Sequence, residues 1–254
     1  MGGTPTFRDH FSASAATYSR YRPRYPDALF GFLSSLCAER EVAWDCGCGN
    51  GQAAVGLAPW FRTVRASDPS AKQIAMATPC ANVAYTCTRA EESGLADASC
   101  DLIAAAQAAH WFAIEAFYEE ARRVSKPAAI IALIGYRPMR VDAALDAVID
   151  HFHATVVGPY WPPERAHVDA AYRSLPFPFD DVTAPTFAMS TAWDLDHVLG
   201  YLGTWSAVSR YRKARGADPI DLVVGALRQA WGDPAVPRPI SWPIHLRVGR
   251  VFGK

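Results

Sequence analysis

Three glycines and an acid form the stretch of this sequence with the clearest chemical potential. Asp45 precedes Gly47, Gly49 and Gly51, and the apolar residues before it predict a strand. Residues 52–58 predict the start of a helix. Glycine permits a sharp turn at positive φ and lets a ligand touch the backbone, and a helix N-terminus offers unpaired N–H groups. Strand, glycine turn and helix predict the first half of a βαβ unit that binds a ligand at the turn.

The spacing of the glycines bears on which ligand this turn binds. A dinucleotide-binding turn has the pattern G-x-G-x-x-G, which seats a pyrophosphate on the helix N-terminus. Gln52 stands where that pattern needs its last glycine. A different cofactor is therefore expected. The alternative is that the turn only joins strand to helix, because short glycine patterns also occur without a ligand.

A second acid ends the next predicted strand. Residues 61–68 have strand character and end in Asp68. An acid at this edge suits a bidentate hydrogen bond to the two hydroxyls of a ribose. Asp68 is equally suited to cap the helix that follows, with Pro69 at the first helical position, and the two roles are compatible.

Further predicted elements extend the same pattern. Strands are expected at 83–87 and 128–135, a loop that runs into a further strand at 96–106, and a helix at 114–124. Alternation of this kind predicts a parallel sheet with right-handed crossovers, on which ligands bind beyond the carboxyl ends of the strands. The residues that we expect around one crevice are those of the glycine loop with Asp68, Ala90, Glu91 and Gln107.

The rest of the chain predicts a cap and a closing strand. Helices are expected at 27–37, 193–211 and 218–231, with strands at 182–189 and 244–252. The predicted fold is a single α/β domain over 1–254, Rossmann-like, with a seven-stranded, mostly parallel sheet, helices on both faces and a helical cap. Its expected parts are an N-terminal arm or lid (1–36), a cofactor-binding core (37–136), a helical cap with one inserted strand (137–232) and a closing strand (233–254).

Composition excludes several classes of function. The chain has 25 basic and 25 acidic side chains, whereas a protein that neutralises phosphates is visibly basic, so no nucleic-acid partner is expected. No apolar run reaches the length of a membrane span, and the six cysteines form no C-x-x-C pair. A cytoplasmic protein without membrane contact is expected.

His151 and His153 are two residues apart on a predicted helix and point to different sides, so no metal site is expected.

Several segments together resemble a known family, the type 11 class I S-adenosylmethionine-dependent methyltransferases. They are Tyr18–Pro26, the glycine loop, Asp68, Arg89–Glu91 and Ala108–Phe112. Tyr160–Arg165 and Thr204–Ala207 resemble the branch that contains trans-aconitate and related small-molecule methyltransferases. The resemblance implies transfer of a methyl group from S-adenosylmethionine to a small-molecule acceptor, with a carboxylate as one candidate, S-adenosylhomocysteine as product and no metal. Trp44 departs from the family pattern, which has a slim aliphatic residue there.

Carried over by position, the resemblance implies contacts for each part of the cofactor. Gly47 and Gly49 would contact the methionine moiety, Ala90 and Glu91 would flank the adenine, and Gln107 would lie near the amino-acid end. Tyr18 and Arg22 either belong to a lid that reaches the cofactor carboxylate or lie in a solvated basic arm. The complete expected cofactor set is Tyr18, Arg22, Asp45, Gly47, Cys48, Gly49, Gly51, Asp68, Pro69, Ala90, Glu91 and Gln107.

The acceptor side depends on His110 and a group of aromatic residues. His110 follows the fourth predicted strand, at the edge where the methyl group is transferred, and is the expected catalytic residue. It would act as a base, or orient the acceptor if that is a carboxylate, or simply line the pocket. The aromatic residues expected at the acceptor, with the plain core as the alternative for the last four, are Trp111, Trp161, Tyr172, Tyr201 and Trp205.

Two other functions are compatible with a fold of this kind. One is a nicotinamide-dependent oxidoreductase, and the other is a protein that binds the cofactor without catalysis. Binding assays with the two cofactors distinguish the first, and turnover to S-adenosylhomocysteine distinguishes the second. The sequence makes no prediction of the oligomeric state.

Overall fold

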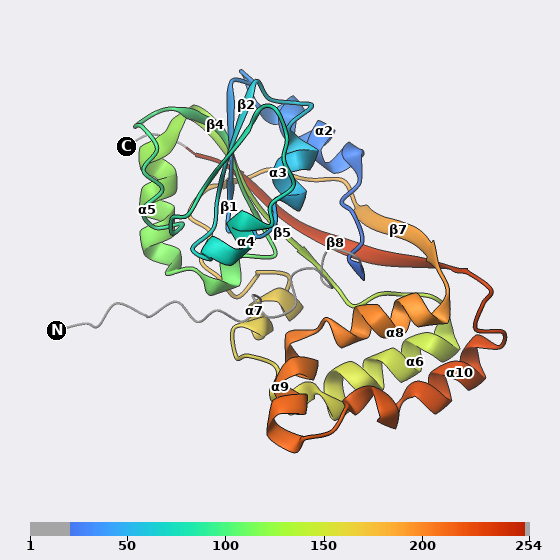
Figure 1. Ribbon diagram of the computed structural model, residues 1–254. Helices are drawn as coiled ribbons and strands as arrows, with labels where there is room; N and C mark the ends of the chain where they lie inside the picture. Colours follow the sequence, from blue (N-terminus) through green and yellow to red (C-terminus); the bar gives the residue numbers. More distant parts are fainter. Residues whose placement is uncertain (1–20, 252–254) are drawn as a thin grey trace.

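A mixed sheet organises the structure, a computed structural model that describes residues 21–251 (Figure 1). The strand order is β3-β2-β1-β4-β5-β8-β6, and β7 pairs with β8. Pairs among β1 to β5 are parallel, whereas β8 runs antiparallel to β5, β6 and β7. The strands are β1(Val42–Cys46), β2(Thr63–Ser67), β3(Val83–Thr86), β4(Cys100–Ala106), β5(Ser125–Tyr136), β6(Asp180–Asp181), β7(Phe187–Trp193) and β8(Arg238–Arg250).

The register of the central strands brings their carboxyl ends to one edge. Asp45 on β1 lies opposite Ala66 on β2 and Ala104 on β4. The loops that follow these three strands therefore begin at the same level. This alignment places the glycine loop, Asp68 and Gln107 beside one another, as the sequence predicts.

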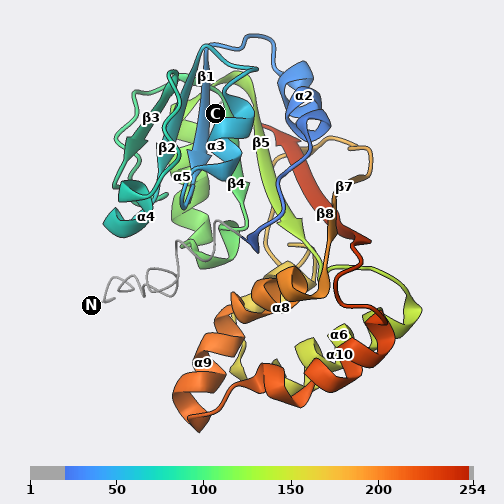
Figure 2. The same ribbon diagram turned by 45° about the vertical axis from the view of Figure 1, so that its right-hand side comes forward.

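Helices cover both faces of the sheet. Helices α2(Asp27–Leu36) and α3(Gln52–Leu57) bury their apolar sides against one face, and α5(Ile114–Val124) packs on the other (Figure 2). The short helix α4(Ala71–Ala75) follows β2. The central strands β4 and β5 contain nearly continuous buried apolar runs, at 102–105 and 129–134, which is expected of strands covered on both faces.

A helical cap stands at one end of the sheet, where β7 and β8 extend beyond the other strands (Figures 1 and 2). Its own core includes Trp231, Trp242 and Tyr201, and it packs against the carboxyl end of β5 through Tyr136. The cap elements are α6(Ala143–His151), η2(Phe152–Val156), η3(Gly158–Tyr160), α7(Arg165–Asp169), α8(Leu195–Gly203), α9(Ser206–Arg215), η4(Pro219–Leu222) and α10(Val224–Trp231).

The α/β class is confirmed, but the predicted number of strands is wrong. The sheet has eight strands because an unexpected two-residue strand, β6, pairs with one end of β8. Of the expected strand at 182–189, only 187–189 is extended in the sheet, as the start of β7, which pairs with the other end of β8. Pro185 lies between the two strands and lacks the N–H group that continued pairing would need. The closing strand, β8, begins at Arg238, which is earlier than expected. Its first residues pair mainly with β7 and not with β5, so prolines without an N–H group are tolerated there.

The predicted helix over 193–211 is also wrong in its continuity. It is divided into α8 and α9 at Thr204 and Trp205. The Thr204 hydroxyl donates to the carbonyl oxygen of Tyr201, and the Trp205 side chain is buried in the core of the cap. Burial of the indole, which no local sequence signal announces, sets the break.

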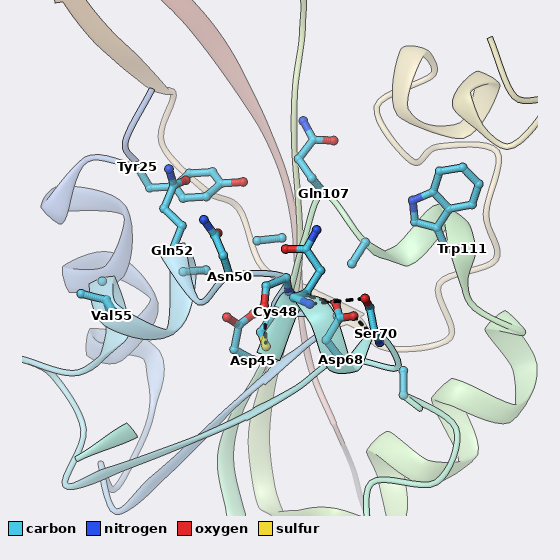
Figure 3. A pocket seen from close by; sticks show the side chains of 18 of the residues that line it. Tyr25, Asp45, Cys48, Asn50, Gln52, Val55, Asp68, Ser70, Gln107 and Trp111 are labelled. Carbon is cyan, nitrogen blue, oxygen red and sulfur yellow. Dashed lines mark hydrogen bonds between the residues drawn. The ribbon is translucent and has the colours of Figure 1, made fainter. Parts of the chain in front are cut away.

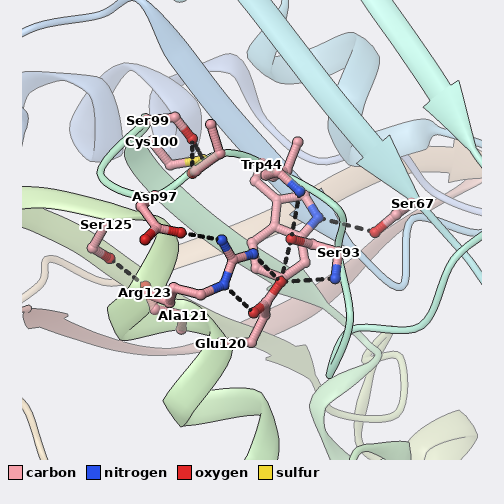
Figure 4. A network of polar contacts seen from close by, with 12 residues as sticks. Trp44, Ser67, Ser93, Asp97, Ser99, Cys100, Glu120, Ala121, Arg123 and Ser125 are labelled. Atoms are coloured by element: carbon pink, nitrogen blue, oxygen red, sulfur yellow. Dashed lines mark hydrogen bonds and ion pairs between the residues drawn. The ribbon is translucent and has the colours of Figure 1, made fainter.

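A polar network secures α5 to the loop between β3 and β4 (Figure 4). The Glu120 carboxylate accepts from the backbone and hydroxyl of Ser93 and pairs with Arg123, which also pairs with Asp97. Trp44, the departure from the family pattern, is fully buried nearby. Its indole N–H donates to the Ser67 hydroxyl over 2.9 Å, so the large ring is accommodated without an unpaired polar group.

Two observations about the described residues concern membranes and metals. Over residues 21–251, no helix has both the length and the apolar character needed to cross a membrane. In the same range, no three histidine, cysteine or acidic side chains are grouped so that they could hold a metal ion. Tyr18 and the first turns of the expected lid lie outside the described residues.

Candidate active site

The three loop glycines have different surroundings. All have positive φ, at 70° for Gly47, 54° for Gly49 and 86° for Gly51. A Cβ on Gly47 would collide with Ala108, and one on Gly51 would collide with Tyr85. Among the atoms that the structure describes outside its chain neighbours, a Cβ on Gly49 would have only the Gln73 side-chain oxygen within 4.0 Å. Gly49 is therefore the position where the bare backbone faces open space, and Gly51 serves packing.

A cavity of about 690 Å³ lies over this loop. Its volume suits a cofactor-sized ligand, since small-molecule sites span about 300–1,000 Å³. Most residues of the expected cofactor set line it, whereas Gly51 does not. The lining members are Arg22, Asp45, Gly47, Cys48, Gly49, Asp68, Pro69, Ala90, Glu91 and Gln107.

Asp45 is a buried acid in the wall of this cavity. Its side chain is 0% exposed, and neither carboxylate oxygen has a partner with hydrogen-bond geometry among the described residues. Burial raises the pKa of Asp45 to about 7, Asp68 adds to the rise, and the Ala54 N–H lowers it without offsetting burial. An unpaired buried carboxylate is costly, and a cationic group in the cavity would compensate it.

Asp68 links the glycine loop to the turn after β2. One carboxylate oxygen accepts from the Gly49 N–H over 2.9 Å and the other from the Ser70 N–H over 2.8 Å (Figure 3). The N-cap of α4 is Ser70, whose hydroxyl accepts from the Gln73 N–H. The prediction of Asp68 as the helix cap is thus wrong, because the helix begins two residues later than expected.

Glu91 and Gln107 occupy the walls on either side. Glu91 accepts from the Ala113 N–H at the start of α5 over 2.8 Å and pairs with Arg89. Gln107 follows β4 at φ 54°, a conformation that residues other than glycine adopt rarely and mostly at functional positions. Its backbone N–H donates to the carbonyl oxygen of Ile134, which fixes the side chain at the carboxyl edge of the sheet.

The segment after residue 20 covers the cavity as a strap, residues 21–26. The Gln52 amide donates to the Pro23 carbonyl oxygen over 2.9 Å, and Arg22 donates to the Tyr136 hydroxyl over 2.6 Å. The Arg22 guanidinium also lies 5.2 Å from the centre of the Tyr201 ring in the cap. Gln52, which replaces the last glycine of the dinucleotide-binding pattern, therefore anchors the strap to the end of the glycine loop.

A second, smaller cavity of about 70 Å³ lies toward the cap. Four residues line both cavities and join them: Arg22, Gln107, Trp111 and Tyr136. Of the aromatic residues expected at the acceptor, Trp111, Trp161, Tyr201 and Trp205 line the second cavity. Tyr172 is not in the lining and is fully buried.

Charge in the second cavity has one sign. Among residues 21–251, its lining includes three arginines, Arg22, Arg137 and Arg165, and no aspartate or glutamate. Arg165 stacks on the Trp161 ring at 4.8 Å and pairs with Asp169, whereas the Arg137 side chain forms no ion pair with any residue in 21–251. Arg137 was missed in the sequence, although its place directly after β5 would have indicated it.

His110 lines the second cavity beside Trp111. Burial lowers the pKa of His110 to about 3, and the positive charge of Arg165 and the neighbouring His167 add to the shift. The imidazole is therefore neutral at cellular pH. His153, considered for metal binding, lies in the same lining between Trp161 and Trp205.

Comparisons with known proteins agree on the class of enzyme. A family described as "Methyltransferase domain" matches residues 44–133. A Dictyostelium discoideum protein described as "Putative methyltransferase" is 34% identical, with 97% of each chain covered. A Saccharomyces cerevisiae protein, "Probable S-adenosylmethionine-dependent methyltransferase CRG1", is 27% identical over 42% of this chain and 40% of its own.

Solved structures extend the agreement to the fold. A structure described as a "Putative Type II Methyltransferase" from Anaeromyxobacter dehalogenans is 46% identical, covers 92% of this chain and all of its own, and gives a TM-score of 0.87. The [4+2]-cyclase SpnF shares the fold at 14% identity, full coverage of both chains and a TM-score of 0.52. A fold shared with a cyclase means that the reaction has to be argued from the site.

Proposed function

Because the chain belongs to the class I S-adenosylmethionine-dependent methyltransferases, we propose that it methylates a small-molecule carboxylate held in the second cavity. The observation that carries this proposal is the charge of that cavity, whose described lining residues include three arginines and no acid. Guanidinium groups form strong charge-assisted hydrogen bonds with carboxylates. The resemblance to the trans-aconitate branch supports the same class of acceptor.

The residues around the main cavity fit the cofactor. Asp68 would accept from the ribose hydroxyls, Asp45 would compensate the ammonium group of the methionine moiety, and Gly49 leaves room for close approach. The bound cofactor supplies a methyl group on a positively charged sulfur, which is already a good leaving group. The work left to the protein is to align the two reactants and exclude water, and alignment can account for most of the acceleration.

A carboxylate acceptor also fits the state of His110. An ionised carboxylate needs no proton removed before it attacks, whereas an amine or phenol does. A general base works best when its pKa is near the working pH, and the pKa of His110 is lowered to about 3 by burial and by Arg165. His110 is therefore poorly suited to be a base and well suited to orient an anion.

The proposal assigns different tasks to the core and the cap. The core, residues 37–136, would hold the cofactor, and the cap, residues 137–232, would close over the acceptor with Trp161, Tyr201 and Trp205. The cavity volume of about 70 Å³ favours a small acceptor.

The test compares carboxylic acids with their primary amides, with S-adenosylhomocysteine formation as the readout. Acids should be turned over and amides should not. Arg137→Gln should raise KM for the acid by about 10- to 100-fold with little change in kcat, since a hydrogen bond to a charged group is worth about 1.5–3 kcal/mol. Arg140→Gln is the control, because Arg140 pairs with Asp150 and does not line the cavity. Equal turnover of acids and amides, or an unchanged KM in Arg137→Gln, would remove the proposal.

A further inference from the structure

His110 and Tyr172 form a pair in the wall of the second cavity. The ring planes differ by 29° with centroids 6.1 Å apart, and Nδ1 of His110 lies 3.2 Å from the Tyr172 hydroxyl oxygen. His110 faces the cavity, whereas Tyr172 is 0% exposed behind it. This contact is the one hydrogen bond of the His110 ring to any residue within 21–251. The other ring nitrogen, Nε2, is therefore left for a ligand.

Burial of the Tyr172 hydroxyl determines the direction of this hydrogen bond. Within the described part of the chain, Nδ1 of His110 is the one acceptor within reach of the phenol. If Nδ1 carried the hydrogen, the phenol hydrogen would be buried without an acceptor, which costs about 1–3 kcal/mol. The phenol therefore donates to Nδ1. A neutral imidazole carries one hydrogen, and it must then be on Nε2.

The backbone around Tyr172 holds the phenol in place at a cost in strain. Ala171 and Tyr172 have φ of 54° and 58°, a region that residues with a side chain adopt rarely. The Tyr172 N–H donates to the His167 carbonyl oxygen over 2.7 Å, and its own carbonyl oxygen accepts from Arg247 over 2.9 Å. Strain of this kind persists where the surroundings enforce it, often near a functional site. The ring is thus fixed relative to His110.

We propose that Tyr172 is a positioning residue that holds His110 as its Nε2–H tautomer, so that His110 presents a hydrogen-bond donor to the acceptor. The consequence for catalysis rests on the proposed function: Nε2–H would donate to an acceptor carboxylate oxygen and orient it, and no proton would be transferred. The tautomer itself is a property of this chain that needs no acceptor.

The direct test is the tautomer of His110 by nuclear magnetic resonance of protein labelled with ¹⁵N-histidine. Long-range ¹H–¹⁵N correlations distinguish a protonated from an unprotonated ring nitrogen, and His110→Gln identifies the signals. We expect Nε2–H with unprotonated Nδ1 in the wild type, and a shifted or mixed pattern in Tyr172→Phe. Tyr118→Phe is the control. It too removes a buried tyrosine hydroxyl, but this hydroxyl donates to the Pro176 carbonyl oxygen and does not contact His110. An Nδ1–H pattern in the wild type would overturn the proposal even if Tyr172→Phe did not fold, and so would unchanged His110 signals in a folded Tyr172→Phe.

Kinetics test the consequence. In His110→Gln the amide can still donate near the place of Nε2, so KM for the acid should rise by less than in His110→Ala, and kcat should change by less than about tenfold. A base role would instead lower kcat by about 10²–10⁴ in both variants. If acids are not substrates at all, the proposed function fails while the tautomer measurement stands on its own.

Discussion

Asp45→Asn should make the cofactor-free protein more stable at neutral and alkaline pH. Asp45 is fully buried, and burial, with a contribution from Asp68, raises the pKa of its carboxyl from 3.8 to about 7 in the folded protein. A folded pKa above the unfolded one means that the native state binds the proton more tightly. The stability from this proton is fully present below pH 3.8 and is lost as the pH rises through about 7.

The difference of about three pKa units corresponds to about 4 kcal/mol, at 1.36 kcal/mol per unit. Asparagine fills the same volume and does not ionise. At pH 8 the variant should exceed the wild type in free energy of unfolding by up to about 4 kcal/mol, and the gap should shrink by about 1.4 kcal/mol for each pH unit below 7. Urea unfolding of cofactor-free protein between pH 5 and 8 measures this gap.

Ionisation of Asp45, which lowers the stability of the cofactor-free protein, should strengthen cofactor binding. If Asp45 compensates the ammonium group, the affinity of the wild type for S-adenosylmethionine should rise about tenfold per pH unit up to pH 7 and then level off, while Asp45→Asn binds weakly at every pH. Asp101→Asn is the control. Asp101 is also buried but accepts from the Glu41 and Val42 N–H groups and pairs with Lys126, so its variant should be less stable and bind the cofactor normally. A stability gap between Asp45→Asn and the wild type that does not vary with pH would refute the reasoning.

Three further changes have definite expected outcomes. Asp68→Ala should weaken cofactor binding by about 2–3 kcal/mol, because it removes a charged acceptor, and Asp68→Asn should cost less; an unchanged dissociation constant by calorimetry would restrict Asp68 to its backbone contacts with Gly49 and Ser70. Gly49→Ala and Gly94→Ala each place a side chain at positive φ in uncrowded surroundings and should each lose about 1–2 kcal/mol of stability, but Gly49→Ala alone should lose cofactor affinity, and equal affinities would contradict the cradle. Burial acts to raise the pKa of Glu120, but hydrogen bonds from Arg123 and Ser93 outweigh burial and lower the pKa. Glu120→Gln should therefore cost about 1–2 kcal/mol of unfolding free energy at pH 7 and progressively less below about pH 4. A loss of stability that persists in acid would mean that packing, not charge, is involved.

The residues of the expected cofactor set that line the main cavity could be predicted to lie together, because their sequence signals are local. The glycine spacing, the acid before it and the acid that follows β2 lie in short segments whose register the parallel sheet fixes. What each glycine does could not be predicted, because the neighbours of Gly47 and Gly51, Ala108 and Tyr85, are distant in sequence. The same holds for Asp68, whose partner in the glycine loop appears only when β1 and β2 pair.

The residues of the second cavity could be predicted only by type. Trp161, Tyr201 and Trp205 are aromatic residues of the predicted cap, but only the packing of the cap brings them to one cavity. Tyr172 was expected to line the cavity but lies behind the lining, where its hydroxyl forms a hydrogen bond with His110. The break at Trp205 shows why: its indole is buried in the core of the cap, a tertiary contact that hydrophobic periodicity does not record.

The chemical stability of the methylated product tests the central claim most directly. Protein incubated with S-adenosylmethionine carrying a labelled methyl group and a panel of small carboxylic acids should yield product that releases its label as methanol in mild alkali, as a methyl ester does. A label that stays on the product in alkali would mean transfer to nitrogen, carbon, sulfur or an ether oxygen, and would contradict a carboxylate acceptor.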